Sequence, residues 1–553
     1  MKPTDLDRRR VVIEHVRPNI DCGRFPAKRT AGEPIVVEAD VFADGHHVLS
    51  AVLRYRRVSP APAGDWREAP MHHVDNDRWQ GTFTPDRIGD YEYTVEAWID
   101  EFGSWRADLE KWAAAGGASD AELAEGAVLV KAAAERAAKA KRADAARALT
   151  AFAAALTTGD LATRVRLALG DDLTVSMARY PDRRRSTTLD APLPLLVDRE
   201  RARFGSWYEM FPRSNSPEPG RSATFREAER QLQRIADLGF DVLYLPPIHP
   251  IGIAARKGPN NNPVCGPGDP GSPWAIGSAE GGHKDVEPGL GTLDDFDHFV
   301  AAARKTGLEI ALDLAYQCSP DHPYVKTHPE WFRHRPDGSI KYAENPPKKY
   351  QDIYPIDFET EDAAGLWEEL RSIILFWMDH GVRIFRVDNP HTKAFRFWEW
   401  ALRSIHRDNP DVIFLAEAFT RPKVMRHLAK LGFTQSYTYF TWRNAKRDIE
   451  EYFIELTTTE MREYFRPNLF ANTPDILHAY LQEGGRPAFQ VRLILAATLG
   501  ATYGIYSGFE ICENQAVAPG SEEYLDSEKY QFRQRQWERP GHINDLIRTV
   551  NAM

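Results

Sequence analysis

The sequence of 553 residues contains little cysteine and no closely spaced pair of it. Disulfide frameworks and structural zinc sites need cysteines or histidines at short, regular intervals. The chain has neither a CxxC motif nor a His-x-x-x-His pair, so the sequence favours a reduced, cytoplasmic protein whose chemistry needs no metal. The four cysteines are scattered along the chain, at Cys22, Cys265, Cys318 and Cys512.

Long apolar runs are also missing. The first sixteen residues, MKPTDLDRRRVVIEHV, are charged and lack the apolar segment of a secretory signal. No stretch of the sequence is long and apolar enough to cross a bilayer. We therefore expect no membrane among the partners of this chain.

Positive charge is not in excess: 70 lysines and arginines stand against 80 acidic residues, a net charge of −10. Binding to nucleic acid usually requires a basic surface, so nucleic acid is disfavoured as a partner. One basic cluster occurs between positions 131 and 147, but acidic residues interrupt it, which favours a solvated helix face or a subunit contact. The cluster consists of Lys131, Arg136, Lys139, Lys141, Arg142 and Arg147, with Glu135 and Asp144 among them.

What is present falls into three parts. Residues 1–105 contain short β-branched and aromatic runs separated by Gly, Pro, Asn and Asp, which predicts a β-sandwich that packs on a catalytic domain or binds carbohydrate. Residues 106–195 are rich in Ala, Glu, Lys and Arg, which are strong helix formers, so we predict a helical insert that could serve as a subunit contact.

Residues 196–553 alternate between short apolar runs and helical patterns. Repeated alternation of this kind predicts a parallel sheet with right-handed crossovers, and eight repeats predict a (β/α)₈ barrel. The fold class expected for the chain is therefore α/β. The eight predicted strands lie in GSWYEMFP, DVLYLPP, LEIALDLA, VRIFRVDNP, VIFLAEAF, QSYTYFTW, LFANTPD and ATYGIYSG.

Acidic residues occur at the ends of four of these strands, where barrel enzymes carry their active sites. Asp313 ends the third strand, Asp388 the fourth and Glu417 the fifth, and Asp475 lies near the end of the seventh. Arg386 stands two positions before Asp388, and that spacing places both side chains on one face of the strand. A charged residue directly after a buried strand needs a partner, so this set favours a catalytic site over solvated surface charge.

Two carboxyl groups are the minimum for glycosyl transfer with retention of configuration. Asp388 suits the nucleophile, because Arg386 would hold it ionised. Glu417 suits the acid/base, because partial burial would raise its pKa. Asp475 would bind sugar hydroxyls and help to distort the ring.

These strand ends resemble the α-amylase superfamily of glycoside hydrolases: FRVD is similar to its nucleophile motif, and the residues near Glu417 and Asp475 to its acid/base and third acid. The resemblance covers roughly residues 200–550. Three departures argue against a plain starch hydrolase. Gln317 stands where amylases usually have His, Pro474 precedes the third acid in place of His, and Asn389 follows the nucleophile.

The departures resemble one subgroup, the α-1,4-glucan:maltose-1-phosphate maltosyltransferases, which also have a β-sandwich and a helical insert before the barrel. This resemblance implies α-maltose 1-phosphate as donor, an α-1,4-glucan as acceptor, no cofactor and a homodimer. It assigns donor contacts to Gln317 and Asn389, beside Arg386. The same resemblance assigns the donor phosphate to Lys257, Asn345, Lys348 and Tyr350.

Other functions remain open from the residues alone. An α-glucoside hydrolase or a sugar phosphorylase would share the barrel and its acids, and a glucan-binding protein without turnover is disfavoured because all three acids are present. Relatives in the subgroup continue into a C-terminal β-domain, whereas this sequence stops at Met553, so we expect that domain to be missing here.

Overall fold

The protein is described by a computed structural model that covers residues 9–346 and 348–553, apart from the side chains at 345 and 348. It divides into two compact units, Met1–Val197 and Asp198–Met553, and each is described by itself. No helix in the described part of the chain is long and apolar enough to cross a membrane.

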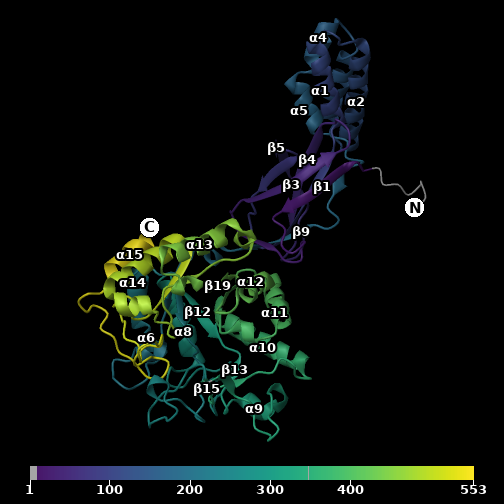
Figure 1. The fold of residues 1–553 in the computed structure, drawn as a ribbon. Coiled ribbons are helices and arrows are strands. Elements are labelled where there is room, and N and C mark those ends of the chain that lie inside the picture. Colours follow the sequence, from purple (N-terminus) through teal and green to yellow (C-terminus); the bar gives the residue numbers. More distant parts are fainter. Residues whose placement is uncertain (1–8, 347) are drawn as a thin grey trace. The chain divides into compact units, whose positions relative to one another are not determined.

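The first unit contains the predicted β-sandwich (Figure 1). Its strands are hydrogen-bonded in the order β1-β3-β6-β5-β4-β7-β9-β2, with β8 on β7, and they enclose an apolar core. In β3, buried and more exposed positions alternate, as expected for a strand with one face in a core. The strands are β1 (Val11–Arg17), β2 (Ala27–Thr30), β3 (Ile35–Ala43), β4 (Leu49–Arg57), β5 (Arg67–Asp75), β6 (Arg78–Phe83), β7 (Gly89–Ile99), β8 (Thr187–Thr188) and β9 (Leu193–Asp198).

The predicted helical insert forms five helices between β7 and β8. Ser119 and Glu122 form a capping box at the start of α2, and small apolar residues of that helix face the core of the insert. β8 and β9 return to the sandwich, a feature that the sequence did not predict, and the division at residues 105 and 195 stays a prediction. The helices are α1 (Glu101–Ala114), α2 (Asp120–Lys139), α3 (Ala143–Ala155), α4 (Leu161–Ala168) and α5 (Asp171–Ala178).

The second unit is the predicted (β/α)₈ barrel. All eight predicted strands form and pair in parallel, in the order β19-β18-β17-β12-β11-β10-β21-β20. A parallel bridge between Ser436 and Pro467 joins the two ends of this order, so the sheet closes. The strands are β10 (Gly205–Glu209), β11 (Val242–Leu245), β12 (Glu309–Leu314), β17 (Ile384–Val387), β18 (Ile413–Ala416), β19 (Gln435–Ser436), β20 (Leu469–Phe470) and β21 (Thr502–Tyr506).

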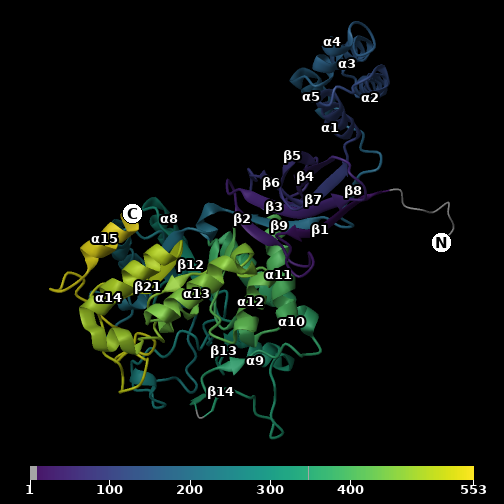
Figure 2. The ribbon, with the colours of Figure 1, turned by 45° about the horizontal axis from the view of Figure 1, so that its top comes forward.

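Helices surround the barrel, and α10, α11 and α12 lie side by side along it (Figures 1 and 2). The long loops with α9, β13 and β15 gather at one end of the unit. The helices are α6 (Phe225–Ala228), α7 (Arg230–Asp237), α8 (Leu293–Lys305), α9 (Pro323–Thr327), α10 (Ala363–Asp379), α11 (Phe395–Asp408), α12 (Pro422–Leu431), α13 (Lys446–Thr458), α14 (Ala479–Leu499) and α15 (Asn544–Ala552). The short loop strands are β13 (Gln317–Cys318), β14 (Ala343–Asn345), β15 (Lys348–Tyr350) and β16 (Tyr354–Pro355).

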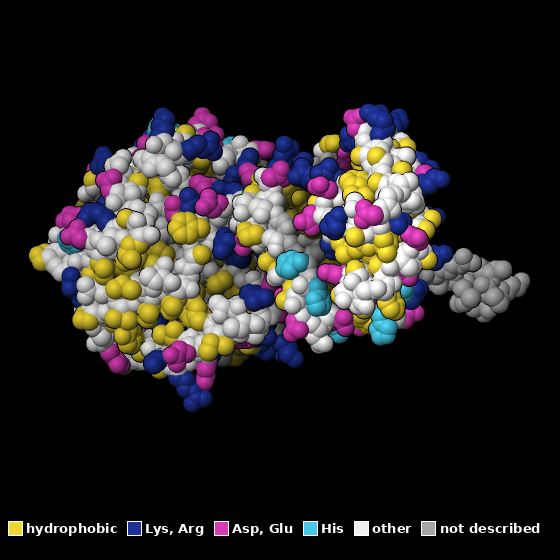
Figure 3. All heavy atoms as spheres, turned by 90° about the horizontal axis from the view of Figure 1, so that it is seen from above, with side chains coloured by type: hydrophobic (Ala, Val, Ile, Leu, Met, Phe, Trp, Pro, Cys, Tyr) yellow, Lys and Arg dark blue, Asp and Glu magenta, His cyan; other side chains and the backbone are white. Residues whose placement is uncertain are grey.

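Charges of both signs are interspersed on the face shown in Figure 3. This mixing agrees with the near balance of 70 basic and 80 acidic residues in the sequence.

Candidate active site

Arg386, inside the barrel on β17, connects three of the predicted carboxyl groups. One guanidinium nitrogen donates to Asp313 and to Asp388, each at 2.8 Å, and the other lies 3.5 Å from Glu417. Arg386 and Asp388 therefore share a face of the strand, as their spacing predicted. A single buried cation therefore contacts carboxyl groups from three neighbouring strands.

The floor of this group is fully buried. The hydroxyl of Tyr244 donates to Asp313, whose pKa burial raises to about 7 although Arg386 opposes the shift. Glu209, at the end of β10, is also buried, and burial raises its pKa well above the ordinary value. Glu209 was not predicted from the sequence, although it is the last residue of the first barrel strand and Asp313 is the next to last of the third.

Glu417 directly follows β18 and lies beside Asp388. Burial raises the pKa of Glu417 to about 7, Arg386 lowers it and the charge of Asp388 raises it further. The structure therefore gives Glu417 the raised pKa that its position in the sequence predicted. A carboxyl group with a pKa near neutrality can both donate and accept a proton during one reaction cycle.

Asn389 connects the two carboxyl groups. Its backbone N–H donates to Glu417 at 3.1 Å, and its side-chain amide lies 3.5 Å from Asp388. The residue has a left-handed backbone, with φ 43° and ψ 51°, which asparagine tolerates better than most residues. In this conformation the backbone N–H faces Glu417 and the side-chain amide faces Asp388.

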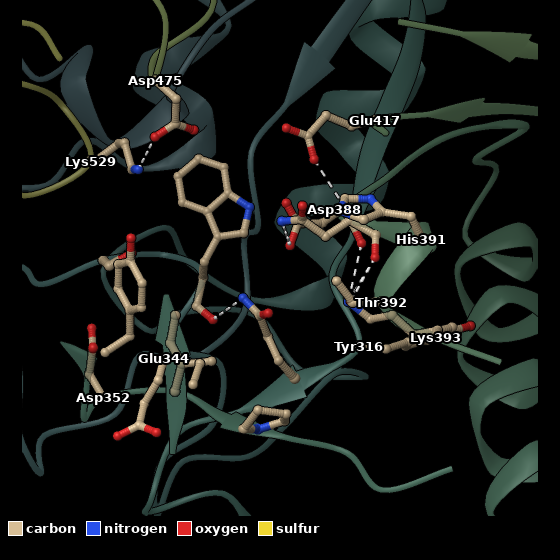
Figure 4. Close-up of a pocket in the computed structure, with 18 of the residues that line it drawn as sticks. Tyr316, Glu344, Asp352, Asp388, His391, Thr392, Lys393, Glu417, Asp475 and Lys529 are labelled. Atoms are coloured by element: carbon tan, nitrogen blue, oxygen red, sulfur yellow. Dashed lines mark hydrogen bonds and ion pairs between the residues drawn. The ribbon is translucent and has the colours of Figure 1, made fainter. Parts of the chain in front are cut away.

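Asp475 lies apart from Asp388 and Glu417, across the pocket (Figure 4). It follows β20 in a loop and pairs with the ammonium group of Lys529 from the loop after β21. Burial opposes the charge of Lys529, but Asp475, Tyr530 and Glu523 together raise the pKa of the lysine. The ammonium also lies 5.4 Å from the centre of the Trp274 ring.

These groups surround one cavity of about 650 Å³ at the carboxyl end of the strands. Its volume is in the range of pockets that bind small molecules. Its walls combine aromatic rings with charged groups, which suits a sugar that carries an anionic substituent. Among its lining residues are Trp274, Tyr316, Gln317, Tyr350, Asp352, Asp388, Asn389, His391, Lys393, Glu417, Phe419, Asp475, Lys529 and Tyr530.

Comparison with known proteins identifies relatives along almost the whole chain. A family model described as α-1,4-glucan:maltose-1-phosphate maltosyltransferase, domain N/S, matches residues 9–199. An α-1,4-glucan:maltose-1-phosphate maltosyltransferase of Chlorobaculum tepidum is 54% identical over 99% of this chain and 80% of its own length. One from Myxococcus xanthus is 52% identical over 98% of this chain and 82% of its own length.

This chain belongs to the α-1,4-glucan:maltose-1-phosphate maltosyltransferase family. An α-amylase structure from Lactobacillus plantarum is 24% identical to the chain, covers 64% of it and 80% of its own length, and has a TM-score of 0.48. The assignment of the barrel rests on the strand pairing described above.

The remaining predicted site residues of this maltosyltransferase-family chain fall into three groups. Gln317 and Tyr350 line the cavity, and the Gln317 amide donates to the Trp274 carbonyl at 3.2 Å. Lys257 is buried and donates to Gln351 at 3.2 Å, and its charge acts on the nearby Asp352. The side chains of Asn345 and Lys348 lie outside the described residues, although their backbones belong to β14 and β15.

Four charged residues of the cavity were missed in the sequence, and one of them is Glu344 on β14. Lys393 and Lys529 lie in loops without a regular pattern, and Asp352 lies in the loop before α10. Asp352 is buried, one of its oxygens makes no hydrogen bond, and burial raises its pKa. The only sequence signal for Lys393 was its position five residues after Asp388.

One histidine cluster has ligand types and spacing suited to a metal. His283, Cys318 and His322 are buried with ligand atoms within 4.8 Å of one another. Because Tyr324 N–H donates to one nitrogen of His322, the other nitrogen carries the proton and donates to His283, which in turn donates to the Ala315 carbonyl. Burial lowers the pKa of His283 to about 4 and that of His322 to about 2, so this network is neutral and each ring nitrogen has a partner.

Proposed function

We propose that this chain transfers maltosyl units from α-maltose 1-phosphate to the non-reducing end of α-1,4-glucans, with release of phosphate. The names of the relatives, at more than half identity over nearly the whole chain, support these substrates. The observation that carries the proposal is the position of Asp388 and Glu417 on one guanidinium at the edge of the cavity. Such a shared partner suits the close carboxyl pair of a retaining mechanism.

In the proposed first step, the carboxylate of Asp388 attacks the anomeric carbon of the donor. The bond between that carbon and the phosphate oxygen breaks, and the phosphate leaves with the bonding electrons. Arg386 holds the attacking carboxylate at 2.8 Å. The product is a covalent maltosyl ester on Asp388.

In the second step, the acceptor hydroxyl gives its proton to Glu417 and attacks the same carbon. The ester bond breaks, and Asp388 returns to a carboxylate. A base with a pKa near 7 is half deprotonated at neutral pH, so Glu417 suits this step.

The departing phosphate carries close to two negative charges and needs cationic or hydrogen-bonding partners. Lys529 supplies an ammonium group at the cavity wall. On the sequence alone, we assign the phosphate contacts to Lys257, Asn345 and Lys348, with Tyr350 beside them.

The test is incubation of the chain with α-maltose 1-phosphate and a short maltooligosaccharide. The proposal expects stoichiometric release of phosphate and glucan products longer by two glucose units. Asp388→Ala should lower the rate by at least about a thousandfold, as is typical when a nucleophile is removed. Its matched control is Asp379→Ala, at the exposed end of α10.

Two outcomes would replace the proposal. Free maltose from an α-glucan without phosphate would identify a hydrolase. Phosphorolysis of a donor other than α-maltose 1-phosphate, with no chain growth, would identify another sugar phosphorylase.

We also propose that the chain is a cytoplasmic homodimer. All four cysteines are unpaired, which suits a reducing compartment. The insert carries a groove of about 570 Å³ between α2 and α3, lined mainly by alanines. Small apolar residues on a helix pair allow close approach of a second surface, so we assign the subunit contact to this insert.

A further inference from the structure

The turn after the nucleophile is held by Lys393, which the proposed steps do not use. Its ammonium group donates to the carbonyls of Asp388 and Asn389, each at 3.3 Å. Thr392 also donates to the Asn389 carbonyl, at 2.8 Å. These bonds fix the left-handed residue whose N–H points at Glu417.

The charge of Lys393 is placed differently from that of the other cations at the site. Arg386 forms ion pairs with its carboxylates and Lys529 pairs with Asp475. Lys393, in contrast, makes its hydrogen bonds to carbonyl groups among the residues that the structure describes. It lines the cavity on the side of Asp388, as Figure 4 shows.

Several charged or titratable groups face Glu417. Arg386 lies 3.5 Å away, and the Asn389 N–H donates to it. The other groups that act on it are Asp388 and Lys393 after β17, Tyr437 after β19 and Asp475 after β20. Asp313 and His391 act on Asp388 in the same way, and burial lowers the pKa of His391. Arg386 and Lys393 are thus two cations that act on this carboxyl pair.

We propose that Lys393 is a positioning residue that holds the left-handed turn between Asp388 and Glu417 and stabilises the ionised form of this carboxyl pair. The proposal rests on the function assigned above, because it concerns the same two carboxyl groups. Lys393 acts through the turn and through its field, not by contact with the reacting atoms.

The test compares Lys393→Met with Lys393→Arg in the pH dependence of kcat/KM for α-maltose 1-phosphate. Loss of the cation should raise the apparent pKa values of the two carboxyl groups, so the limbs of the pH profile that they set should move to higher pH. At the effective dielectric constant of protein sites, we expect a shift of about one pH unit. Lys393→Arg should leave them within about 0.3 units of the parent chain. Lys423→Met, exposed on α12, is the matched control.

A purely structural role would lower the rate at every pH without moving the limbs, and that result would overturn the proposal. If Lys393→Met does not fold, Lys393→Gln carries the same comparison. If the parent chain releases no phosphate, the proposed function is wrong. The role of Lys393 is then tested by carbon-13 NMR of the chain with labelled glutamate. The Glu417 signal, assigned by its loss in Glu417→Gln, should then titrate at higher pH in Lys393→Met, and an unchanged titration would overturn the role.

Discussion

Glu417 separates the two half-reactions of the proposed mechanism. Phosphate is a good leaving group and needs little help from an acid, whereas the acceptor hydroxyl must lose a proton. Glu417→Ala should therefore release up to about one phosphate per active site and then stall as a maltosyl ester on Asp388. Intact-protein mass spectrometry should show the mass of the added disaccharide. A chain that gives neither the burst nor the adduct would remove Glu417 from the acid/base role.

The burial of Glu417 also affects stability. Its pKa is raised from 4.5 to about 7 in the folded chain, so the folded state holds more protons than the unfolded state between these values. The free energy of unfolding therefore falls as the pH rises from about 4.5 to about 7. Above pH 7, where Glu417 is ionised in both states, this loss of stability is complete and no longer changes with pH.

Glu417→Gln removes this cost. We expect it to raise the free energy of unfolding by about 2 kcal/mol at pH 8 and to change it little at pH 4. Denaturant titrations at the two pH values measure the difference. Glu483→Gln, exposed on α14, should show no such dependence on pH. An equal gain at both pH values would contradict the assigned pKa.

Arg386, Asp388 and Glu417, which the sequence predicted, directly follow or lie within a buried strand. Asp388 and Glu417 directly follow β17 and β18. The repeated alternation of strands and helices in the sequence therefore predicted their positions. Lys393 and Lys529 were missed because they lie in irregular loops, where position depends on tertiary contacts. The pairing of Lys529 with Asp475, 54 positions away, has no counterpart in local sequence pattern.

At the scale of elements, the loops after β11 and β21 depend on one buried arginine. One guanidinium nitrogen of Arg213 donates to the carbonyls of Gly271, Glu528 and Lys529, at 3.0, 2.7 and 3.1 Å. The two loops supply Trp274 and Lys529 to the cavity. Arg213 thus links two loops that form neighbouring parts of the cavity wall.

We expect Arg213→Met to raise KM for the sugar phosphate about tenfold and to lower kcat less, because binding groups move while Asp388 and Glu417 stay on Arg386. Steady-state kinetics with varied donor measure the two constants. Arg447→Met, exposed on α13, is the matched control. A fall in kcat with unchanged KM would show that Arg213 does not position the donor wall.

The elements themselves were largely predictable. All eight barrel strands occur where the apolar runs predicted them, because parallel strands buried on both faces read as continuous apolar segments. In residues 1–105 the β-branched and aromatic runs coincide with β1, β3, β4, β6 and β7 but not with β2 or β5, and β8 and the start of β9 lie in the segment predicted to be helical. β5 is mostly exposed and therefore lacks an apolar run, and β8 has only two residues.

At the scale of the whole molecule, the proposed dimer gives a direct prediction. Sedimentation should give about twice the 62.7 kDa mass of one chain. Val128 is 67% exposed and lines the groove between α2 and α3, so Val128→Asp should produce monomers because a charge would be buried at the contact. Val175→Asp, at a residue 54% exposed on α5, should leave the dimer intact. A parent chain that sediments as a monomer would contradict the proposed homodimer.

The position of β9 in the sandwich affects the order in which a growing chain folds on the ribosome. β9 lies between β7 and β2 in the sheet, yet it is synthesised after the whole helical insert. The insert makes mostly local contacts and can form as soon as it emerges, whereas β2 waits for a partner more than 160 residues later in the chain. During translation, the helical bundle should therefore resist protease before β2 does.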